Sequence, residues 1–311
     1  MRVMFLGTPE YAAIPLRALA ADPRYTVVGV VTQPDRPAGR GRSAEPPPVK
    51  RAALDLGVPV LQPPTLRDAE VVAQLANWQP DVGVVAAYGE ILRRNVLELP
   101  PLGYLNIHPS LLPRYRGPTP VHAAILNGDA ETGVTVMRLD AKMDSGPILA
   151  QERVLLPPDA RNGPLTSELF ELGSRLLAEA LAAYANGSLL PAPQDDAQAT
   201  YCRMLQKSDG IIDWNAPAVQ IERMTRAYDP WPGAQTSWQG QPFKIIAARA
   251  EPGAAGSAAP GTLLLRPNGV AVASGDGALE LLTVQPAGKR PLSAAAWRNG
   301  LHGAEGARLG G

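Results

Sequence analysis

Cysteine, histidine and long apolar runs are all scarce in this chain of 311 residues. Cys202 is the only cysteine, which excludes an intramolecular disulfide and a cluster of cysteine metal ligands. Only three histidines are present, which argues against a histidine-rich metal centre. No run approaches the ~18 apolar residues of a membrane-spanning helix, and the first residues lack the features of a secretory signal. We therefore expect a cytoplasmic protein that binds neither a metal nor a membrane.

An excess of one charge sign is also missing, because 29 Lys and Arg balance 29 Asp and Glu. A net charge of zero argues against a globally basic nucleic-acid-binding protein. Positive charge is local instead. Residues 33–51 carry five basic side chains against two acidic ones, and residues 201–311 carry 11 against 8. Either region can meet a polyanion, although solvated surface is the simpler interpretation for the second.

The first half of the chain alternates strand-like apolar runs with helical patterns. The strand-like runs fall at residues 3–6, 25–32, 58–61, 82–86 and 102–108, and the helical patterns at 15–21, 50–56 and 68–77. This alternation predicts a doubly wound, Rossmann-like α/β fold with a mostly parallel sheet covered by helices on both faces. Alternating polarity at 132–139 and 148–154 predicts an antiparallel extension, and 165–185 reads as a helix.

The texture of the sequence changes after about residue 190. The polar stretch that begins at Pro191 reads as a linker, and short strand-like runs between Gly and Pro turns follow it. We therefore predict a catalytic domain at 1–190, a linker at 191–205, and a small OB-like β-barrel at 206–311 with a frayed tail after Arg298. Within the first domain, residues 33–48 hold seven Pro and Gly and are predicted to form a long loop without regular structure.

Common nucleotide-binding and hydrolase signatures are missing. The turn after the first strand is Gly7-Thr8-Pro9-Glu10, and Pro9 removes a backbone donor where a pyrophosphate would bind. No P-loop and no G-x-S-x-G elbow occur. The sequence therefore disfavours a dinucleotide-binding protein, a P-loop NTPase and an α/β-hydrolase.

The densest polar cluster spans residues 106–117. Asn106 and His108 lie two positions apart on a predicted strand, so their side chains share a face at the edge where open α/β sheets bind ligands. An amide beside an imidazole can hold a developing oxyanion and move a proton. Asp144, in a later turn, can orient His108. Taken alone, a structural histidine and a turn-capping aspartate are the simpler explanation of these residues.

The run N-x-H-x-S-L-L-P-R-Y-R-G at 106–117, followed by M-D-S-G at 143–146, resembles the formyltransferase family that uses 10-formyltetrahydrofolate. The resemblance extends over nearly the whole chain, through residues 5–10, 87–89, 128–135, 213–214, 230–234 and 285–289. It implies that Asn106, His108 and Asp144 are catalytic and that the reaction needs no metal. It further implies a folate-binding surface made of Ser110, Leu111, Leu112, Pro113, Ala87, Tyr88 and Gly89.

The basic loop separates branches of this family. It resembles the loop of the members that act on initiator methionyl-tRNA, and it implies that Arg36, Arg40 and Arg42 contact the acceptor arm. The implied activity is formylation of the methionine α-amine for translation initiation, by a monomer. Three alternatives stay open: an amino-sugar-nucleotide formyltransferase, a 10-formyltetrahydrofolate hydrolase, and a tRNA-binding protein with an inactive site. The basic loop argues against the first two, and the intact triad argues against the third.

Three further observations accompany the resemblance. Pro109 stands where this branch more often has Gly or Ala, and residues 118–120 also depart from the usual pattern. Arg114 and Arg116 are expected either to steer the substrate or to form ion pairs on the surface.

Overall fold

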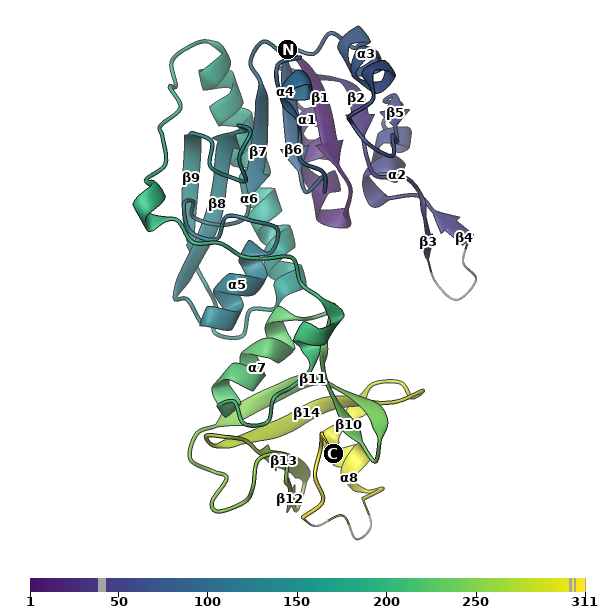
Figure 1. Ribbon diagram of the computed structural model, residues 1–311, viewed down its shortest axis with the longest axis vertical. Coiled ribbons are helices and arrows are strands. Elements are labelled where there is room, and N and C mark those ends of the chain that lie inside the picture. Colours follow the sequence, from purple (N-terminus) through teal and green to yellow (C-terminus); the bar gives the residue numbers. More distant parts are fainter. Residues whose placement is uncertain (39–42, 302–303, 305, 311) are drawn as a thin grey trace. The chain divides into compact units, whose positions relative to one another are not determined.

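The structure is a computed structural model that describes residues 1–38, 43–301, 304 and 306–310. The chain divides into two compact units, each with a sheet of its own (Figure 1). The first unit comprises Met1–Pro120, Glu131–Leu155 and Leu165–Arg203. The second comprises Val121–Ala130, Leu156–Pro164 and Met204–Gly311. No helix within the described ranges is long and apolar enough to cross a membrane.

A seven-stranded sheet organises the first unit, in the order β5-β2-β1-β6-β7-β8-β9. Five neighbouring strands run parallel: β1 (Arg2–Gly7), β2 (Thr26–Val31), β5 (Val60–Leu61), β6 (Val82–Ala86) and β7 (Tyr104–His108). Two antiparallel strands extend it, β8 (Glu131–Arg138) and β9 (Ile148–Leu155). The predicted mostly parallel sheet and its antiparallel extension are both confirmed.

Helices cover both faces of this sheet, because its central strands are apolar on both sides. In β1, Val3 and Phe5 belong to one apolar cluster and Met4 and Leu6 to another, as the two-residue period of a strand requires. The first cluster packs under α1 (Ala13–Ala21), α2 (Pro48–Asp55) and α6 (Asn162–Ala185), and the second under α3 (Ala69–Asn77) and α4 (Arg94–Leu97). A short 3-10 turn, η1 (Glu10–Ala12), precedes α1.

The strand order places a switch point beside β1. The chain goes from β1 to β2 on one side and later returns to β6 on the other side. Ligands of open α/β sheets bind in the crevice that such a reversal opens at the carboxyl ends of the strands. The turns at 7–9 and 87–89 follow β1 and β6 at this edge.

The prediction of an irregular loop at 33–48 is wrong for part of that segment. Strands β3 (Arg36–Ala38) and β4 (Ser43–Glu45) pair in an antiparallel hairpin (Figure 1). Pro37 stands opposite Ala44. Both strands of a two-stranded ribbon have a free edge, and such an edge tolerates a residue that cannot donate a backbone hydrogen bond. Arg40 and Arg42 lie outside the described residues.

The second unit contains a six-stranded antiparallel sheet in the order β10-β11-β14-β13-β12, with β15 pairing β14. The strands are β10 (Ala234–Trp238), β11 (Gln241–Glu251), β12 (Leu263–Arg266), β13 (Gly269–Ala273), β14 (Ala278–Pro286) and β15 (Leu292–Ser293). The predicted antiparallel β domain is therefore confirmed. The remaining helices are α5 (Pro120–Asn127), α7 (Ala218–Ala227) and α8 (Ala294–Arg298), and the 3-10 turn η3 (Lys207–Gly210) also belongs to this unit. Another 3-10 turn, η2 (Asp196–Gln198), belongs to the first unit.

The expectation of a frayed tail after Arg298 is also wrong for the described residues. The Leu309 side chain is 2% exposed, and its backbone N–H donates to the Gly261 carbonyl over 2.9 Å. The N–H of Leu263, at the start of β12, donates to Ala307. The tail thus pairs with the edge of the sheet, where unpaired backbone groups are otherwise left exposed.

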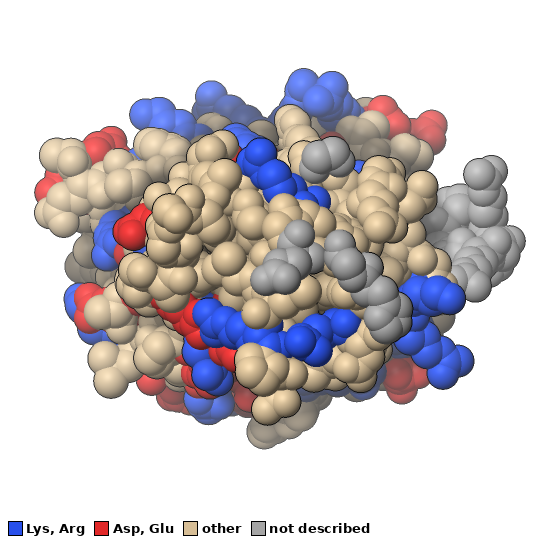
Figure 2. All heavy atoms as spheres, turned by 90° about the horizontal axis from the view of Figure 1, so that it is seen from below, with Lys and Arg blue, Asp and Glu red and all other residues tan. Residues whose placement is uncertain are grey.

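Charge on the second unit is partly neutralised within it. Arg226, Arg249 and Arg266 form ion pairs with Glu222, Glu280 and Glu251. By contrast, seven basic side chains of this unit form no salt bridge with any described residue: Lys207, Arg223, Lys244, Lys289, Arg290, Arg298 and Arg308. On the face of the protein in Figure 2, basic side chains cover more of the surface than acidic ones.

Candidate active site

Asn106 and His108 lie at the carboxyl end of β7, two positions apart in the sequence and on the same face of the strand. Their exposed fractions are only 8% and 4%. Flanking strands β6 and β8 hydrogen-bond to both sides of β7, so the two side chains project from a rigid support. The sequence placed them on a strand end, and the structure adds that they are buried.

The ring of His108 is held in one orientation. Its Nε2 lies 2.9 Å from the carbonyl oxygen of Tyr115, and a carbonyl only accepts hydrogen bonds. Nε2 therefore donates, and in the neutral ring Nδ1 is left without a proton. Nδ1 faces the Oδ2 atom of Asp144 across 3.8 Å. The ring can accept a proton at Nδ1 and give it back there, with a carboxylate beside it.

Asp144 sits in a turn between β8 and β9 with a backbone φ of +47°. Its Oδ2 atom accepts a hydrogen bond of 2.8 Å from the Gly117 N–H. The turn itself is capped by a different carboxylate, because Asp140 accepts from the Lys142 N–H and the Ser145 hydroxyl. Asp144 is thus not the capping residue of this turn and is available to His108.

The Ser110–Pro113 loop is tied to the two antiparallel strands. The hydroxyl of Thr135 on β8 donates to the Ser110 carbonyl over 2.6 Å and accepts from the Leu112 N–H over 3.2 Å. Gln151 on β9 donates to the Leu112 carbonyl over 2.7 Å. Thr135 is fully buried. These bonds hold the predicted folate loop in a defined shape before any ligand binds.

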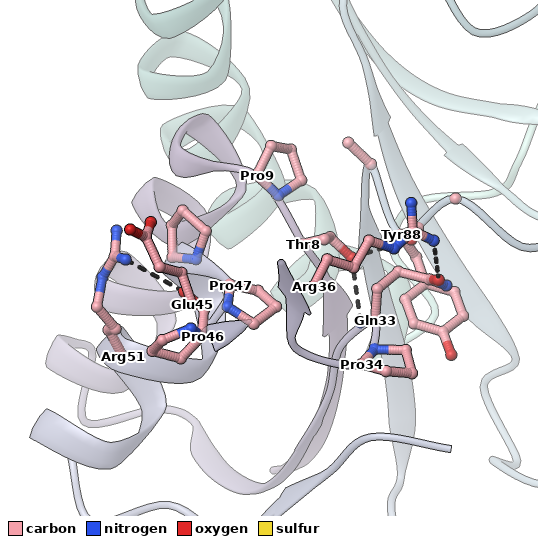
Figure 3. A pocket seen from close by; sticks show the side chains of 13 residues that line it. Thr8, Pro9, Gln33, Pro34, Arg36, Glu45, Pro46, Pro47, Arg51 and Tyr88 are labelled. Atoms are coloured by element: carbon pink, nitrogen blue, oxygen red, sulfur yellow. Dashed lines mark hydrogen bonds between the residues drawn. The ribbon is translucent and has the colours of Figure 1, made fainter. Parts of the chain in front are cut away.

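A cavity of about 550 Å³ opens at the carboxyl ends of β1, β2 and β6, at the switch point (Figure 3). The Thr8 hydroxyl donates to the Tyr88 carbonyl and so ties two of its walls. The lining consists of Thr8, Pro9, Gln33, Pro34, Arg36, Glu45, Pro46, Pro47, Pro48, Arg51, Ala87, Tyr88 and Gly89. It includes three predicted folate residues and one predicted tRNA residue, but not Asn106, His108, Asp144 or Ser110–Pro113.

The buried Tyr88 hydroxyl beside this cavity has no hydrogen-bond partner among the described residues. Burial, with a smaller contribution from Glu90, raises the pKa of that hydroxyl, so it stays protonated.

The base of the hairpin β3–β4 is tied down by polar contacts. Lys50 forms an ion pair of 2.7 Å with Asp35, and Gln62 donates to Asp35 over 2.6 Å and to the Gln33 carbonyl. Lys50, followed by Gln62, lowers the pKa of the Asp35 carboxyl. Because Lys50 is occupied in this way, it contributes little free charge. Arg36, which donates to Gln33, is exposed.

Arg116 corrects an expectation from the sequence. It does form an ion pair, with the exposed Asp196 over 2.7 Å, but its own side chain does not lie on the surface, because only 2% of it is exposed. Its guanidinium binds Gln194, Asp196 and Tyr201, all in the segment predicted to be a linker. Sequence reasoning also missed Thr135 and Gln151. No local signal identifies any of these residues, since their partners are distant in the chain.

No group of three or more His, Cys, Asp or Glu side chains within the described ranges could hold a metal ion. The polar groups that converge at the end of β7 are an amide, an imidazole and a carboxylate. This arrangement can stabilise negative charge on an oxygen and move a proton, which suits acyl transfer to an amine.

Solved structures of two other proteins share this fold. HypX from Aquifex aeolicus in complex with tetrahydrofolic acid matches with a TM-score of 0.61 and 20% identity, over 96% of this chain and 46% of that one. WlaRD, a sugar 3N-formyl transferase in the presence of dTDP and 5-N-formyl-THF, matches with a TM-score of 0.64 and 18% identity, over 93% of this chain and 99% of that one. At these identities the likeness concerns the fold.

Sequence comparison is more specific. Residues 1–181 match the Formyl transferase family, and residues 204–302 match the family of the Formyl transferase C-terminal domain. A protein of Roseiflexus sp. (strain RS-1) named methionyl-tRNA formyltransferase is 66% identical over 310 residues, which are 100% of this chain and 95% of the relative. The protein therefore belongs to the methionyl-tRNA formyltransferase family.

Proposed function

We propose that this protein transfers a formyl group from 10-formyltetrahydrofolate to the α-amino group of methionine esterified to initiator tRNA. It does so as a cytoplasmic monomer, for translation initiation. The observation that carries the proposal is the pair of half-buried Asp144 and buried His108, which shares a strand face with Asn106, in a chain that is 66% identical to a methionyl-tRNA formyltransferase. Relatives that are 60–66% identical over 98–100% of this chain are named methionyl-tRNA formyltransferase, which favours this acceptor over the sugar-nucleotide and hydrolase alternatives.

The reaction forms a bond between the amine nitrogen and the formyl carbon and breaks the bond from that carbon to the folate nitrogen. One proton must leave the amine and one must reach the departing nitrogen. We assign this proton movement to Nδ1 of His108, because Nε2 is committed to the Tyr115 carbonyl. Asp144, 3.8 Å from Nδ1, stabilises the charged ring and connects it to solvent. General acid–base groups of this kind contribute about 10²–10⁴ in rate.

Asn106 completes the site. While the amine adds, negative charge develops on the formyl oxygen. The Asn106 amide and the protonated Nδ1 of His108 are the donors that we assign to that oxygen. A good oxyanion donor is worth about 10²–10³ in rate. No covalent intermediate on the protein is needed, because an α-amine with a pKa of roughly 7.7–8 has a neutral fraction near pH 7.

The residues present fit a folate as formyl donor. The Ser110–Pro113 loop is pinned by Thr135 and Gln151 and combines leucine side chains with backbone polar groups, which suits a flat apolar ring with a polar edge. Ala87–Gly89 adds the edge of the neighbouring cavity. The tetrahydrofolic acid bound to HypX, which shares the fold, supports the same ligand class.

Contact with tRNA is assigned to the basic hairpin and to the second unit. Arg36 is exposed on β3, and Arg40 and Arg42, which lie outside the described residues, belong to the same basic segment. Lys207, Lys244, Lys289 and Arg290 of the second unit are free of ion pairs among described residues. We keep the domain boundaries 1–190, 191–205 and 206–311 as part of this proposal, with the last domain binding tRNA.

The decisive test is an assay of the full chain with 10-formyltetrahydrofolate and charged tRNA. We expect formylated initiator methionyl-tRNA and little product on elongator methionyl-tRNA. Parallel reactions with a dTDP-linked amino sugar and with water alone test the two enzymatic alternatives. Formyl transfer to the sugar, or folate hydrolysis without tRNA product, would overturn the proposed substrate.

A second test addresses the hairpin. Arg42→Ala should lower kcat/KM on methionyl-tRNA about tenfold or more, because a charge-assisted contact contributes about 1.5–3 kcal/mol. Arg40→Ala should act in the same direction but less strongly. Folate affinity, measured by titration, should stay unchanged in both. Arg17→Ala is the matched control, because Arg17 is an exposed arginine on α1. If Arg42→Ala has no effect at low and high salt, the hairpin does not clamp the tRNA.

A further inference from the structure

Gln194 lies in the segment that sequence analysis treats as a linker, yet its side chain contacts the turn that carries Asp144. Its Nε2 atom donates to two backbone carbonyls, those of Asp144 over 2.9 Å and Gly146 over 2.7 Å. Both hydrogens of the amide are therefore used on a single turn. The two carbonyls lie on either side of Ser145, so the amide spans the turn immediately after the candidate catalytic carboxylate.

The backbone conformation of that turn depends on contacts from outside the turn. Asp144 has a φ of +47°, in the left-handed region that residues with a Cβ atom seldom adopt. A Cβ atom at position 146 would collide with the backbone carbonyl of Arg138, so the backbone here is tightly confined. Strained conformations persist only where surrounding contacts over-determine them. The amide of Gln194 supplies two such contacts.

Gln194 is itself held by a buried cation. Its Oε1 atom accepts from Nε and Nη2 of Arg116, over 3.0 Å and 2.8 Å. Two further donors of this guanidinium bind the Asp196 carboxylate over 2.7 Å and the Tyr201 hydroxyl over 3.1 Å. With Arg116 only 2% exposed and held by four hydrogen bonds, the position of the Gln194 amide is set by a rigid group.

The backbone groups on either side of Arg116 bind His108 and Asp144 directly. Tyr115 accepts from His108 Nε2 through its carbonyl, and Gly117 donates its N–H to the Asp144 carboxylate. We infer that Gln194, anchored by Arg116, is a positioning residue that fixes the separation between His108 and Asp144. This inference rests on the proposed function, since it assigns a role to that pair.

The chemistry of the side chain explains why a glutamine stands here. The carbonyls of Asp144 and Gly146 need two N–H donors on one atom, and the Arg116 guanidinium needs an acceptor. Only a primary amide offers both donors and acceptor in one side-chain group. Glutamate at this position would set a second carboxylate oxygen against two carbonyls. Methionine has a similar length but offers no donor and only a weak acceptor, so it removes the two hydrogen bonds to the turn and the two from Arg116 without creating a large cavity.

The test uses Gln194→Met with Gln198→Met as its matched control. Gln198 is an exposed glutamine of the same segment whose amide binds only Asp195 among the described residues. We expect Gln194→Met to lower kcat about ten- to hundredfold, because a misplacement near 1 Å can cost that much. KM for folate and for methionyl-tRNA should change less than about threefold, and the pH profile of kcat should shift. The control should leave all of these unchanged.

A double-mutant cycle separates positioning from general destabilisation. In an Asp144→Asn background, Gln194→Met should have almost no further effect on kcat, because the group that it positions is already disabled. A merely structural role would lower kcat by the same factor in both backgrounds. Equal factors, or an unchanged kcat in Gln194→Met alone, would overturn the inference.

A readout without catalysis keeps this inference apart from the proposed function. The Gly117 amide donates to the Asp144 carboxylate, so its hydrogen exchange should accelerate in Gln194→Met and not in Gln198→Met. Unchanged Gly117 exchange overturns the inference even if the wild-type protein formylates another acceptor. If the wild-type protein does not formylate methionyl-tRNA but the exchange of the Gly117 amide is accelerated in Gln194→Met, only the proposed function is overturned.

Discussion

Two segments of the first unit follow parallel strands at the same edge of the sheet, and they differ in how they are held. The segment after β7, residues 109–117, is hydrogen-bonded to β8, β9 and the 194–202 segment. The segment after β2, residues 32–48, forms the hairpin β3–β4. The ion pair and hydrogen bond that anchor this hairpin lie at its base, around Asp35. The first segment carries buried polar groups and the second carries exposed charge.

The difference matches the two tasks of the proposed reaction. Transfer of a one-carbon group needs donors fixed to within a fraction of an ångström, which buried hydrogen bonds provide. Contact with a large polyanion needs charge that can adapt to the partner. Leaving a buried polar group without its partner costs about 1–3 kcal/mol, whereas an exposed ion pair contributes about 0–1 kcal/mol. Changes in the first segment should therefore affect turnover, and changes in the second should affect recognition.

The largest effects should come from the residues that the β7 segment supports. Asn106→Ala, His108→Ala and Asp144→Ala should each reduce kcat at least about tenfold to a hundredfold while the protein stays folded. Single-turnover kinetics together with circular dichroism measure both quantities. Near-wild-type turnover in His108→Ala would remove the functional distinction between the two segments.

The next effect concerns the folate loop. Thr135→Val removes the hydroxyl shared by Ser110, Leu112 and Gln151, so we expect a loss of about 1–3 kcal/mol in unfolding free energy. The apparent affinity for folate should fall several-fold. Thr132→Val, on the same strand, is the control, because the Thr132 hydroxyl bonds to no described residue. A weakened tRNA interaction with intact folate binding would contradict the assignment of this loop.

A smaller effect is expected at the base of the hairpin. Lys50→Met leaves Asp35 without its ion pair and should lower kcat/KM on methionyl-tRNA a few-fold, with folate affinity unchanged. Adding Asp35→Asn removes the unpaired carboxylate, so the double variant should recover part of the loss. The comparison of the two variants at low and high salt checks this. If Lys50→Met lowers kcat and leaves KM for tRNA constant, the hairpin acts in the chemical step instead.

The smallest effect on activity is expected at His122, which lies outside both segments. Burial lowers the pKa of His122 to about 4. Between that pH and the ordinary value near 6.5 the unfolded chain binds the proton and the folded chain does not, so stability rises with pH across this window. His122→Gln should remove this pH dependence, which amounts to about 3 kcal/mol across the window. Urea unfolding at several pH values measures it, and identical slopes in both proteins would reject the assignment.

Local patterns in the sequence predicted much of the architecture of the first unit. The continuous apolar run of β1 and the alternation of strands with helices predict the parallel sheet, and the alternating run of β8 predicts its extension. Asn106 and His108 were identifiable because a strand places residues i and i+2 on one face, Asp144 was a candidate partner in a later turn, and the family resemblance favoured catalysis for all three. Each of these signals depends on neighbours along the chain.

Contacts between distant segments were decided only by the tertiary structure. Pro37 reads as a strand breaker until its strand is seen to have a free edge, and the tail around Leu309 reads as frayed until it pairs with Gly261. Gln194 lies 78 positions from Arg116 and 50 from Asp144, so no periodicity relates them. Composition and periodicity show which residues are apolar and which side chains can act chemically. Only the folded chain decided which of them meet, because hydrogen-bond partners are selected by proximity in space.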